Sequence, residues 1–289
     1  MREFEDKVAV VTGGSSGIGR ALVERFARER MKVVIADIDE EALAETDTIM
    51  KASGATILPI VVDVSKLTDV KVLARKTLEA FGVVHILCNN AGVMAGNTIW
   101  ETTFQDWKWV IDVNLWGVIY GLRVFVPLML EQDTDCHIIN TASIAGLTSE
   151  PYCGTYRMTK HAVVSLSETL YHELNLINAK VKVSVLCPEW VKTRLDKAEQ
   201  HRPLGLRNKP DEQVEQEENP NYQKIKQFFY EGIQSGISSK QVAGFVLDAI
   251  KNDKFYILTH PESKRRIQMR MKDILGDRNP TNMANMMPR

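Results

Sequence analysis

The stretch "KVAVVTGGSSGIGRALVERF", Lys7–Phe26, changes its pattern of apolar residues halfway along. A short apolar run ends in glycines, and the residues after it carry apolar side chains at helical spacing. This pattern predicts a strand, a tight turn and a helix. Glycines let such a turn approach a pyrophosphate closely, and the helix N-terminus attracts its negative charge, although a plain structural turn explains the glycines alone about as well. The turn residues predicted to contact a nucleotide are Gly13, Ser15, Ser16, Gly17, Ile18 and Gly19.

Apolar runs and helical patterns alternate along the rest of the chain. The expected strands span 7–14, 32–37, 56–64, 85–92, 137–143, 181–188 and 254–260. The expected helices span 19–31, 40–54, 67–82, 103–131, 156–174, 238–252 and 261–275. Continuous apolar strands separated by amphipathic helices predict an α/β fold with a parallel sheet covered on both faces. Pro59 favours an edge position for its strand, because proline donates no backbone hydrogen bond.

A chain of 289 residues with this alternation is expected to form one domain, 1–289. The segment 195–223 breaks the pattern, since it is polar, charged and interrupted by three prolines. It is predicted to be a mobile substrate-binding loop or to include a short surface helix, and its acidic run 211–221 is too poor in apolar residues for the core. The residues 276–289 are expected to form a flexible tail or to cap a partner subunit.

The composition is ordinary for a soluble globular protein, with 44% hydrophobic and 25% charged residues. A formal net charge of -1 gives no global field that would favour nucleic acid or anionic lipid. We find no signal peptide and no apolar run near membrane-spanning length, so the expected location is the cytoplasm, without a membrane partner. The four cysteines lack the spacing of a metal site, and most lie in apolar runs, which predicts buried free thiols.

Asp37 ends the second expected strand, twenty residues after Gly17. A carboxylate there can accept hydrogen bonds from the ribose hydroxyls of adenosine, and it repels a 2′-phosphate. Because the next residue is Ile38 rather than arginine or lysine, the charge favours NAD over NADP, with Asp37 and Ile38 as cofactor contacts. A helix-capping or loop carboxylate is the alternative interpretation of Asp37.

Seven short motifs follow one another along the chain. They are "TGGSSGIG", "DV" at Asp63 and Val64, "NNAG" at 89–92, Asn114 in "VNLWG", Ser143 in "NTASIAG", "YRMTK" at 156–160 and "CPEWVKT" at 187–193. Each is weak alone, but seven in this order resemble the short-chain dehydrogenase/reductase family, from Lys7 to about Thr193. The resemblance implies a Rossmann-type, doubly wound parallel seven-stranded sheet. It also implies NAD(P)-dependent hydride transfer between an alcohol and a carbonyl.

The family's catalytic residues match Asn114, Ser143, Tyr156 and Lys160. Tyr156 and Lys160 stand one helical turn apart, so both side chains can point the same way, although a helix-surface pair has the same spacing. A tyrosine has a pKa of about 10, which a lysine ammonium and the positive nicotinamide ring would lower. Tyr156 is therefore expected to act as the acid/base, with Lys160 lowering its pKa and binding ribose. Ser143 would position the substrate oxygen, and Asn114 would support a proton-relay water.

The resemblance implies further cofactor contacts after the glycine turn. They are Asp63, Val64, Asn90, Ala91, Gly92, Tyr156, Lys160, Pro188, Val191 and Thr193, with Asn89 expected in the same wall. The family usually has glycine where this chain has Glu189. A glutamate adopts glycine's backbone angles only at a cost, and Glu189 is expected to face solvent or to form a salt bridge rather than to shape substrate choice.

Substrate contacts are expected around the catalytic set and in the 195–223 segment, which would close over the cofactor. The predicted contacts are Met94, Ser143, Ala145, Cys153, Tyr156 and Trp190. These residues are mostly apolar, and no basic residue stands beside the catalytic serine. They favour a hydrophobic secondary alcohol or its ketone, of cyclic, aryl or steroid-like type. His161 follows Lys160 directly and is expected to face away from the catalytic side.

Family members are often dimers or tetramers, and the apolar helices with Trp109, Trp116, Tyr120 and Val163 offer an interface unless these residues pack in the core. Two other functions stay open. One is an NADPH-dependent ketoreductase of fatty-acid or polyketide type, against which Asp37 argues. The other is a non-catalytic cofactor-binding regulatory protein, since a fold alone does not fix activity. The complete catalytic set argues against it.

Overall fold

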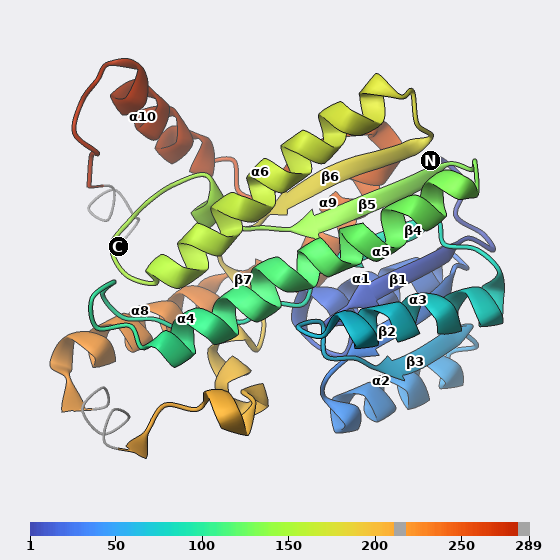
Figure 1. The fold of residues 1–289 in the computed structure, drawn as a ribbon, viewed down its shortest axis with the longest axis horizontal. Helices are drawn as coiled ribbons and strands as arrows, with labels where there is room; N and C mark the ends of the chain where they lie inside the picture. The colour runs from blue at the N-terminus through green and yellow to red at the C-terminus, as the bar shows by residue number, and fades with distance from the viewer. Residues whose placement is uncertain (211–217, 283–289) are drawn as a thin grey trace.

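The computed structural model describes residues 1–210 and 218–282. Among them, seven parallel strands form the main sheet in the order β3-β2-β1-β4-β5-β6-β9 (Figure 1). The strands are β1 (Val8–Thr12), β2 (Lys32–Asp37), β3 (Ile57–Val61), β4 (Ile86–Asn89), β5 (Cys136–Thr141), β6 (Val181–Cys187) and β9 (Tyr256–Leu258). Pro59 lies on the outer strand β3, as predicted. The doubly wound Rossmann-type fold is therefore confirmed.

Helices cover both faces of this sheet. One face carries α1 (Gly17–Arg28), α2 (Glu40–Ala52) and α9 (Ser239–Asn252). The other carries α3 (Leu67–Phe81), α5 (Gly117–Glu131) and α6 (Gly154–Leu176), which lie in front of the sheet in Figure 1. In β1, Ala9 and Val11 pack toward the first face and Val8 and Val10 toward the second. Side chains alternate along a strand, so each strand contributes to both core layers.

Local sequence signals end and begin these helices where expected. α3 stops at Gly82, which takes a left-handed φ of 74°. Ser238 caps α9 by accepting a hydrogen bond from the Gln241 amide, and the Gln241 side chain accepts one in return. Asp39 caps α2 by accepting from the Ala42 amide. The capping carboxylate of this segment is therefore Asp39, which removes helix capping as the explanation of Asp37.

The helical stretch expected at 103–131 is one continuous run. It consists of α4 (Phe104–Ile111), a π-helical turn at Asp112–Trp116, and α5. Within the described residues this run is long and apolar enough to cross a membrane by length and composition, which corrects the expectation that no such run exists. Core helices pass the same test, and α5 buries Val118, Phe125 and Met129.

The polar segment 195–223 is not one continuous loop. It contains 3₁₀ helices at Leu195–His201 and Leu204–Leu206, and α8 (Pro220–Ser235) begins inside it. Proline suits the first turn of a helix, because the backbone amide it lacks has no partner there. The acidic residues 211–217 lie outside the described residues.

Part of the expected tail folds back on the last helix, α10 (Ser263–Leu275). Arg278 forms an ion pair with Asp273 at 3.2 Å, and the Thr281 amide donates to the same carboxylate at 3.0 Å. The residues 276–282 are thus bonded to α10 rather than free. Met283, Met286 and Met287 lie outside the described residues.

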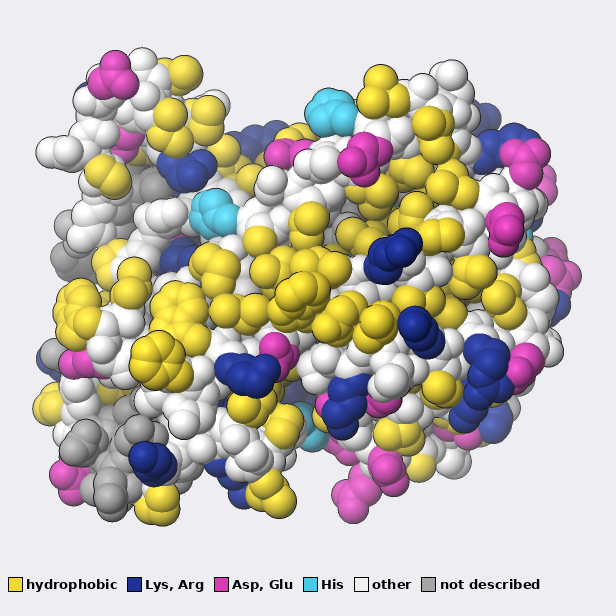
Figure 2. Space-filling model, viewed as in Figure 1, with side chains coloured by type: hydrophobic (Ala, Val, Ile, Leu, Met, Phe, Trp, Pro, Cys, Tyr) yellow, Lys and Arg dark blue, Asp and Glu magenta, His cyan; other side chains and the backbone are white. Residues whose placement is uncertain are grey.

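Apolar side chains gather over α4, α5 and α6 on the face seen in Figure 2. Trp116 is 43% exposed there and stacks on Tyr120, with ring centres 5.4 Å apart. Trp109 and Val163, expected at a subunit interface, are buried in the core instead. The oligomeric state therefore stays a prediction.

Candidate active site

A cavity of about 320 Å³ opens at the carboxyl ends of the sheet strands, where β1 and β4 lie side by side. The connections from these two strands run in opposite directions, and doubly wound sheets bind ligands at such a point. Every predicted site residue lines this cavity except Gly19 and Asn114. The sequence motifs, which are spread over about 180 residues of chain, therefore meet at one place.

The glycine turn forms one wall of the cavity. Gly13 and Gly17 have φ angles of 62° and 51°, which other residues adopt only with strain. A Cβ added at Gly13 would lie 2.9 Å from the Ala91 Cα. At Gly19 it would lie 1.9 Å from the carbonyl oxygen of Gly13, so Gly19 supports the turn from behind rather than lining the cavity.

Asp37 joins this turn to β2. Its Oδ2 accepts a hydrogen bond from the Ser15 amide at 2.9 Å, and its Oδ1 accepts one from the Asp39 amide at 3.2 Å. The residue is 9% exposed and lines the cavity. A carboxylate offers about four acceptor sites, so positions remain for hydroxyl donors. Bare glycine backbone followed by a partly unsatisfied carboxylate fits the pyrophosphate and ribose of a dinucleotide.

The "NNAG" segment is anchored to β1 through Thr12. The Thr12 hydroxyl accepts from the amides of Asn90 and Ala91, and the Asn90 side chain donates to the Thr12 carbonyl at 3.0 Å. Asn89 does not belong to the cavity wall, contrary to expectation. Its side chain points into the core and donates to Asn140 at 2.9 Å, because neighbouring side chains of a strand face opposite sides.

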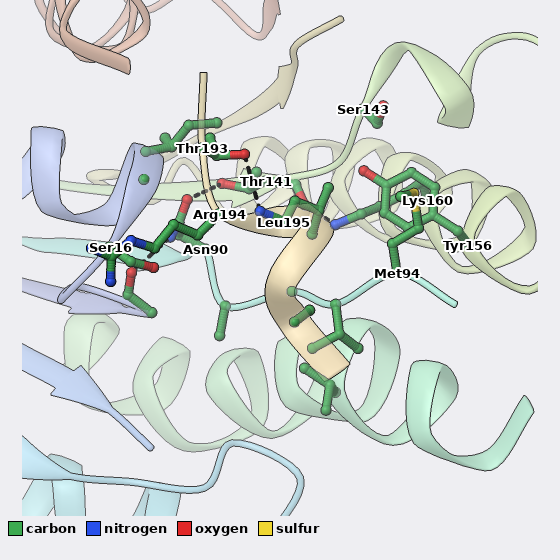
Figure 3. Close-up of a pocket in the computed structure, with 18 of the residues that line it drawn as sticks. Ser16, Asn90, Met94, Thr141, Ser143, Tyr156, Lys160, Thr193, Arg194 and Leu195 are labelled. Carbon is green, nitrogen blue, oxygen red and sulfur yellow. Dashed lines mark hydrogen bonds between the residues drawn. The ribbon is translucent and has the colours of Figure 1, made fainter. Parts of the chain in front are cut away.

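Ser143, Tyr156 and Lys160 meet at the other end of the cavity (Figure 3). α6 carries Tyr156 and Lys160, and Ser143 follows β5. The Lys160 ammonium donates to the Thr141 carbonyl at 2.9 Å and lies 5.4 Å from the centre of the Tyr156 ring. His161 lies away from the cavity, as predicted, with its Nδ1 3.0 Å from the Arg157 carbonyl oxygen.

Burial dominates the pKa values of this pair. It raises the pKa of Tyr156 to about 12, although a hydrogen bond with Ser143 acts in the opposite direction. It lowers the pKa of Lys160 to about 8. The expectation that Lys160 lowers the Tyr156 pKa is therefore not met by the protein groups alone, because burial destabilises both the phenolate and the ammonium. A lowered phenol pKa requires a further positive charge close to Tyr156.

Asn114 lies in the π-helical turn and is fully buried. Its Oδ1 accepts from the Val93 amide at 2.8 Å, and its Nδ2 donates to the Val93 carbonyl at 2.9 Å. These two bonds fix the chain beside the cavity. Because the side chain is committed to Val93, a water-holding role would fall mainly to the backbone carbonyl, whose direction a π turn changes.

Aromatic residues of α8 line the substrate end and were missed by sequence reasoning. The Trp190 ring centre lies 5.6 Å from that of Phe228 and 5.7 Å from that of Phe229. Ile225 and Ile233 are buried one helical turn on either side of Phe229. This apolar i, i+4, i+8 spacing was the signal that could have identified the helix.

Four charged residues also line the substrate end: Glu150, Arg157, Glu189 and Arg266. Arg266 comes from α10 and forms an ion pair with Glu189 at 2.5 Å. Of the outcomes expected for Glu189, the salt bridge is the one found. Basic residues were not expected beside Ser143, but tertiary folding brings both arginines into the wall of the same cavity.

The segment 195–208 contributes a further part of the cavity wall. Leu195, Ala198 and Leu206 line it. Arg202 holds this segment on α4, since its guanidinium donates to Asp106 at 2.7 Å and lies 4.9 Å from the centre of the Trp109 ring. Part of the segment predicted to close over a cofactor thus lines the cavity.

Comparisons with known proteins agree with this geometry. The family model described as short chain dehydrogenase matches residues 7–203. A CLA biosynthesis dehydrogenase/reductase of Lactiplantibacillus plantarum is 36% identical over 280 residues, covering 97% of both chains. A 1-deoxy-11-beta-hydroxypentalenate dehydrogenase of Streptomyces exfoliatus is 30% identical over 273 residues, covering 94% of this chain and 89% of that protein. The crystal structure of a short chain dehydrogenase/reductase from Burkholderia phymatum in complex with NAD superposes with a TM-score of 0.93. It is 46% identical and covers 97% of this chain and 98% of that one.

Proposed function

The chain belongs to the short-chain dehydrogenase/reductase family of oxidoreductases, and from that premise we propose that it is an NAD-dependent alcohol dehydrogenase. It would interconvert a hydrophobic secondary alcohol and its ketone. One observation carries the proposal: Ser143, Tyr156 and Lys160 meet in the same cavity as the glycine turn and Asp37. A cofactor bound along the turn would therefore extend to the proton-transfer group.

NAD fits the residues of this cavity. The glycine turn would hold the pyrophosphate, and Asp37 would accept from the adenosine ribose hydroxyls and repel the 2′-phosphate of NADP. Lys160 would hold the nicotinamide ribose, and Thr193 the carboxamide. The NAD in the 46% identical structure of the Burkholderia phymatum protein supports this choice. When bound, NAD accepts the hydride from the alcohol carbon.

Tyr156 would take the hydroxyl proton during oxidation and return it during reduction. Ser143, whose hydroxyl already accepts from the Ala145 amide at 3.1 Å, would donate to the substrate oxygen. Because burial raises the Tyr156 pKa to about 12, the phenol can act as a base only when positive charge is added nearby. The oxidised nicotinamide would supply that charge, which couples proton transfer to cofactor binding.

The walls of the substrate end support an apolar substrate of cyclic, aryl or steroid-like type. Trp190, Phe228 and Phe229 offer ring faces there, with Met94 and Cys153 beside them. The charged residues at this end neutralise one another, with two carboxylates and two guanidinium groups. The proposed setting is a cytoplasmic homo-oligomer acting on a small molecule.

The proposal is tested by absorbance at 340 nm with NAD or NADP and a panel of cyclic, aryl and steroidal secondary alcohols. We expect reduction of NAD by apolar members of the panel, and little reduction of NADP. Tyr156→Phe should lower kcat by about 10²-fold to 10⁴-fold, the usual contribution of a general acid or base, with the Kd for NAD unchanged. Near wild-type turnover by this variant would remove Tyr156 from the mechanism. NAD binding without turnover of any alcohol would favour a regulatory binding protein.

A further inference from the structure

The four charged side chains at the substrate end form one connected cluster. Glu150 forms ion pairs with Arg157 at 2.6 Å and with Arg266 at 3.1 Å. Arg266 forms a second ion pair with Glu189 at 2.5 Å, and Ser263 of α10 donates a hydrogen bond to the same carboxylate. The side chains of Glu150 and Arg266 are only 4% and 9% exposed. Arg266 therefore bridges two carboxylates that belong to two separate loops.

The first loop leads into α6 and is strained. Tyr152 and Cys153 have φ angles of 68° and 53°, so two consecutive non-glycine residues take the left-handed conformation. Non-glycine residues keep this conformation only where neighbouring contacts hold them in it. Here Arg157 donates to the Tyr152 carbonyl at 3.1 Å while pairing with Glu150. The turn sets the start of α6, and Tyr156 follows in its first turn.

The second loop follows β6 and contacts Ser143. The Pro188 carbonyl accepts from the Ser143 hydroxyl at 3.3 Å and from the Ile144 amide at 2.9 Å. Glu189 is the next residue, so its ion pair with Arg266 fixes the backbone immediately after this carbonyl. Glutamate stands where the glycine usual at this position has no side chain. Its carboxylate therefore connects α10 to the loop that accepts the hydrogen bond of Ser143.

We propose that Arg266 is a positioning residue of the active site, by which the C-terminal helix α10 holds the loops of both Tyr156 and Ser143. Its planar guanidinium presents Nη1 to Glu150 and Nη2 to Glu189, whereas a lysine would have to reach both carboxylates from one ammonium nitrogen. The inference rests on the proposed function, since the positions of these two residues matter for turnover. Arg266 touches the cavity wall but acts through the two carboxylates.

The test compares Arg266→Met with Arg278→Met in steady-state turnover of the best alcohol. Arg278 is a matched control, because it also forms an ion pair, with Asp273 of α10, but is 56% exposed and does not line the cavity. A displacement of about 1 Å at a reacting group can cost about 100-fold in rate, so Arg266→Met should lower kcat by about 10-fold to 100-fold. The Kd for NAD should rise by a smaller factor than kcat falls, because the glycine turn after β1 and Asp37 at the end of β2 lie outside the two loops that Arg266 pairs with.

Two further variants keep the inference falsifiable if Arg266→Met folds poorly. Arg266→Lys retains the positive charge but replaces the two guanidinium nitrogens by one ammonium nitrogen, and it should show an intermediate kcat. Glu189→Gln added to Arg266→Met removes a carboxylate charge that has lost its ion pair and retains only Ser263 as a hydrogen-bond donor, and it should restore part of the lost kcat. A variant that loses thermal stability but keeps wild-type kcat would show that Arg266 is structural only and would overturn the inference.

A second readout needs no substrate. Cys153 lies in the strained turn and is buried, so release of this turn should expose its thiol. Labelling by a thiol reagent, located by mass spectrometry, should be several-fold faster at Cys153 in Arg266→Met than in Arg278→Met, with buried Cys88 as an internal reference. Equal labelling together with equal kcat would refute the positioning role. Silence of the wild type with every alcohol would instead defeat the proposed function, while the labelling would still test Arg266.

Discussion

Arg202→Met should loosen the segment 195–208 and weaken NAD binding. The Arg202 side chain is 1% exposed, although it lies in a polar segment of the chain. It donates to Asp106 of α4 at 2.7 Å, and its guanidinium lies 4.9 Å from the centre of the Trp109 ring. Methionine keeps much of the volume but removes both contacts. Asp106 retains Asn208 and the Thr103 amide as hydrogen-bond donors.

The contacts of Arg202 determine how much the Kd for NAD should rise. A hydrogen bond between charged groups contributes about 1.5 to 3 kcal/mol, and a largely desolvated cation–π contact about 1 to 2 kcal/mol. The additional pair with Glu199 adds little, because that carboxylate is 57% exposed. Together the buried contacts stabilise the docked segment by about 3 kcal/mol, or about 100-fold in population. The Kd for NAD rises by the factor by which the docked fraction falls, so we expect a rise of up to about 100-fold, which is reached when the undocked state predominates in the variant.

Isothermal titration with NAD measures this effect directly. Arg207→Met is the matched control, because Arg207 is exposed on the same segment. Hydrogen exchange over 195–208 should be faster in Arg202→Met and unchanged in Arg207→Met. An NAD Kd within twofold of the wild type for Arg202→Met, with a lowered Tm, would refute the reasoning. Arg202 would then stabilise the fold without holding the segment over the cofactor.

Three further outcomes follow from the site. Asp37→Ala should lower the kcat/KM ratio of NAD over NADP at least about tenfold, through loss of charged hydrogen bonds, and an unchanged ratio would remove the ribose contact. Gly19→Ala should abolish NAD binding, because its Cβ would lie 1.9 Å from a backbone oxygen. As a control, the added Cβ of Gly244→Ala has no atom within 4 Å, and this variant should stabilise α9 by about 0.5–1 kcal/mol. The Lys160 pKa falls from 10.5 to about 8 on folding, so the unfolded chain binds more protons between these pH values and stability should rise across this window. Lys160→Met should flatten that rise in urea unfolding, and an identical pH profile would contradict the lowered pKa.

The parts of the fold and site that sequence predicts well are set by local spacing. Tyr156 and Lys160 share a helix face whenever that helix forms, and the glycine turn is defined by the strand and helix that flank it. Asp37 closes a strand whose partner is its neighbour in sequence. Such motifs need only the backbone geometry of a few residues, which the side-chain types themselves favour.

The residues after the strand ends are a second group whose place in the fold could be predicted from the sequence. In a parallel sheet all carboxyl ends meet at one edge, so residues after β1, β2, β4, β5 and β6 must converge once the strand order is known. This explains why almost every predicted site residue lines the cavity. Gly19, Asn89 and Asn114 do not line it. For Asn89 the reason is that adjacent side chains of a strand point to opposite faces.

The remaining features were decided by tertiary structure. Arg266 meets Glu150 across 116 residues, and Arg202 meets Asp106 across 96. Nothing local distinguishes these arginines from exposed ones such as Arg207, since the carboxylate that pairs with each of them comes from a distant part of the chain. The pKa of Tyr156 belongs here too, because burial is a property of the assembled core and outweighs the hydrogen bond with Ser143. By itself, the sequence determined the fold and the family, and it predicted most of the residues that line the cavity; only the packing of α4, α8 and α10 decided what covers and holds them.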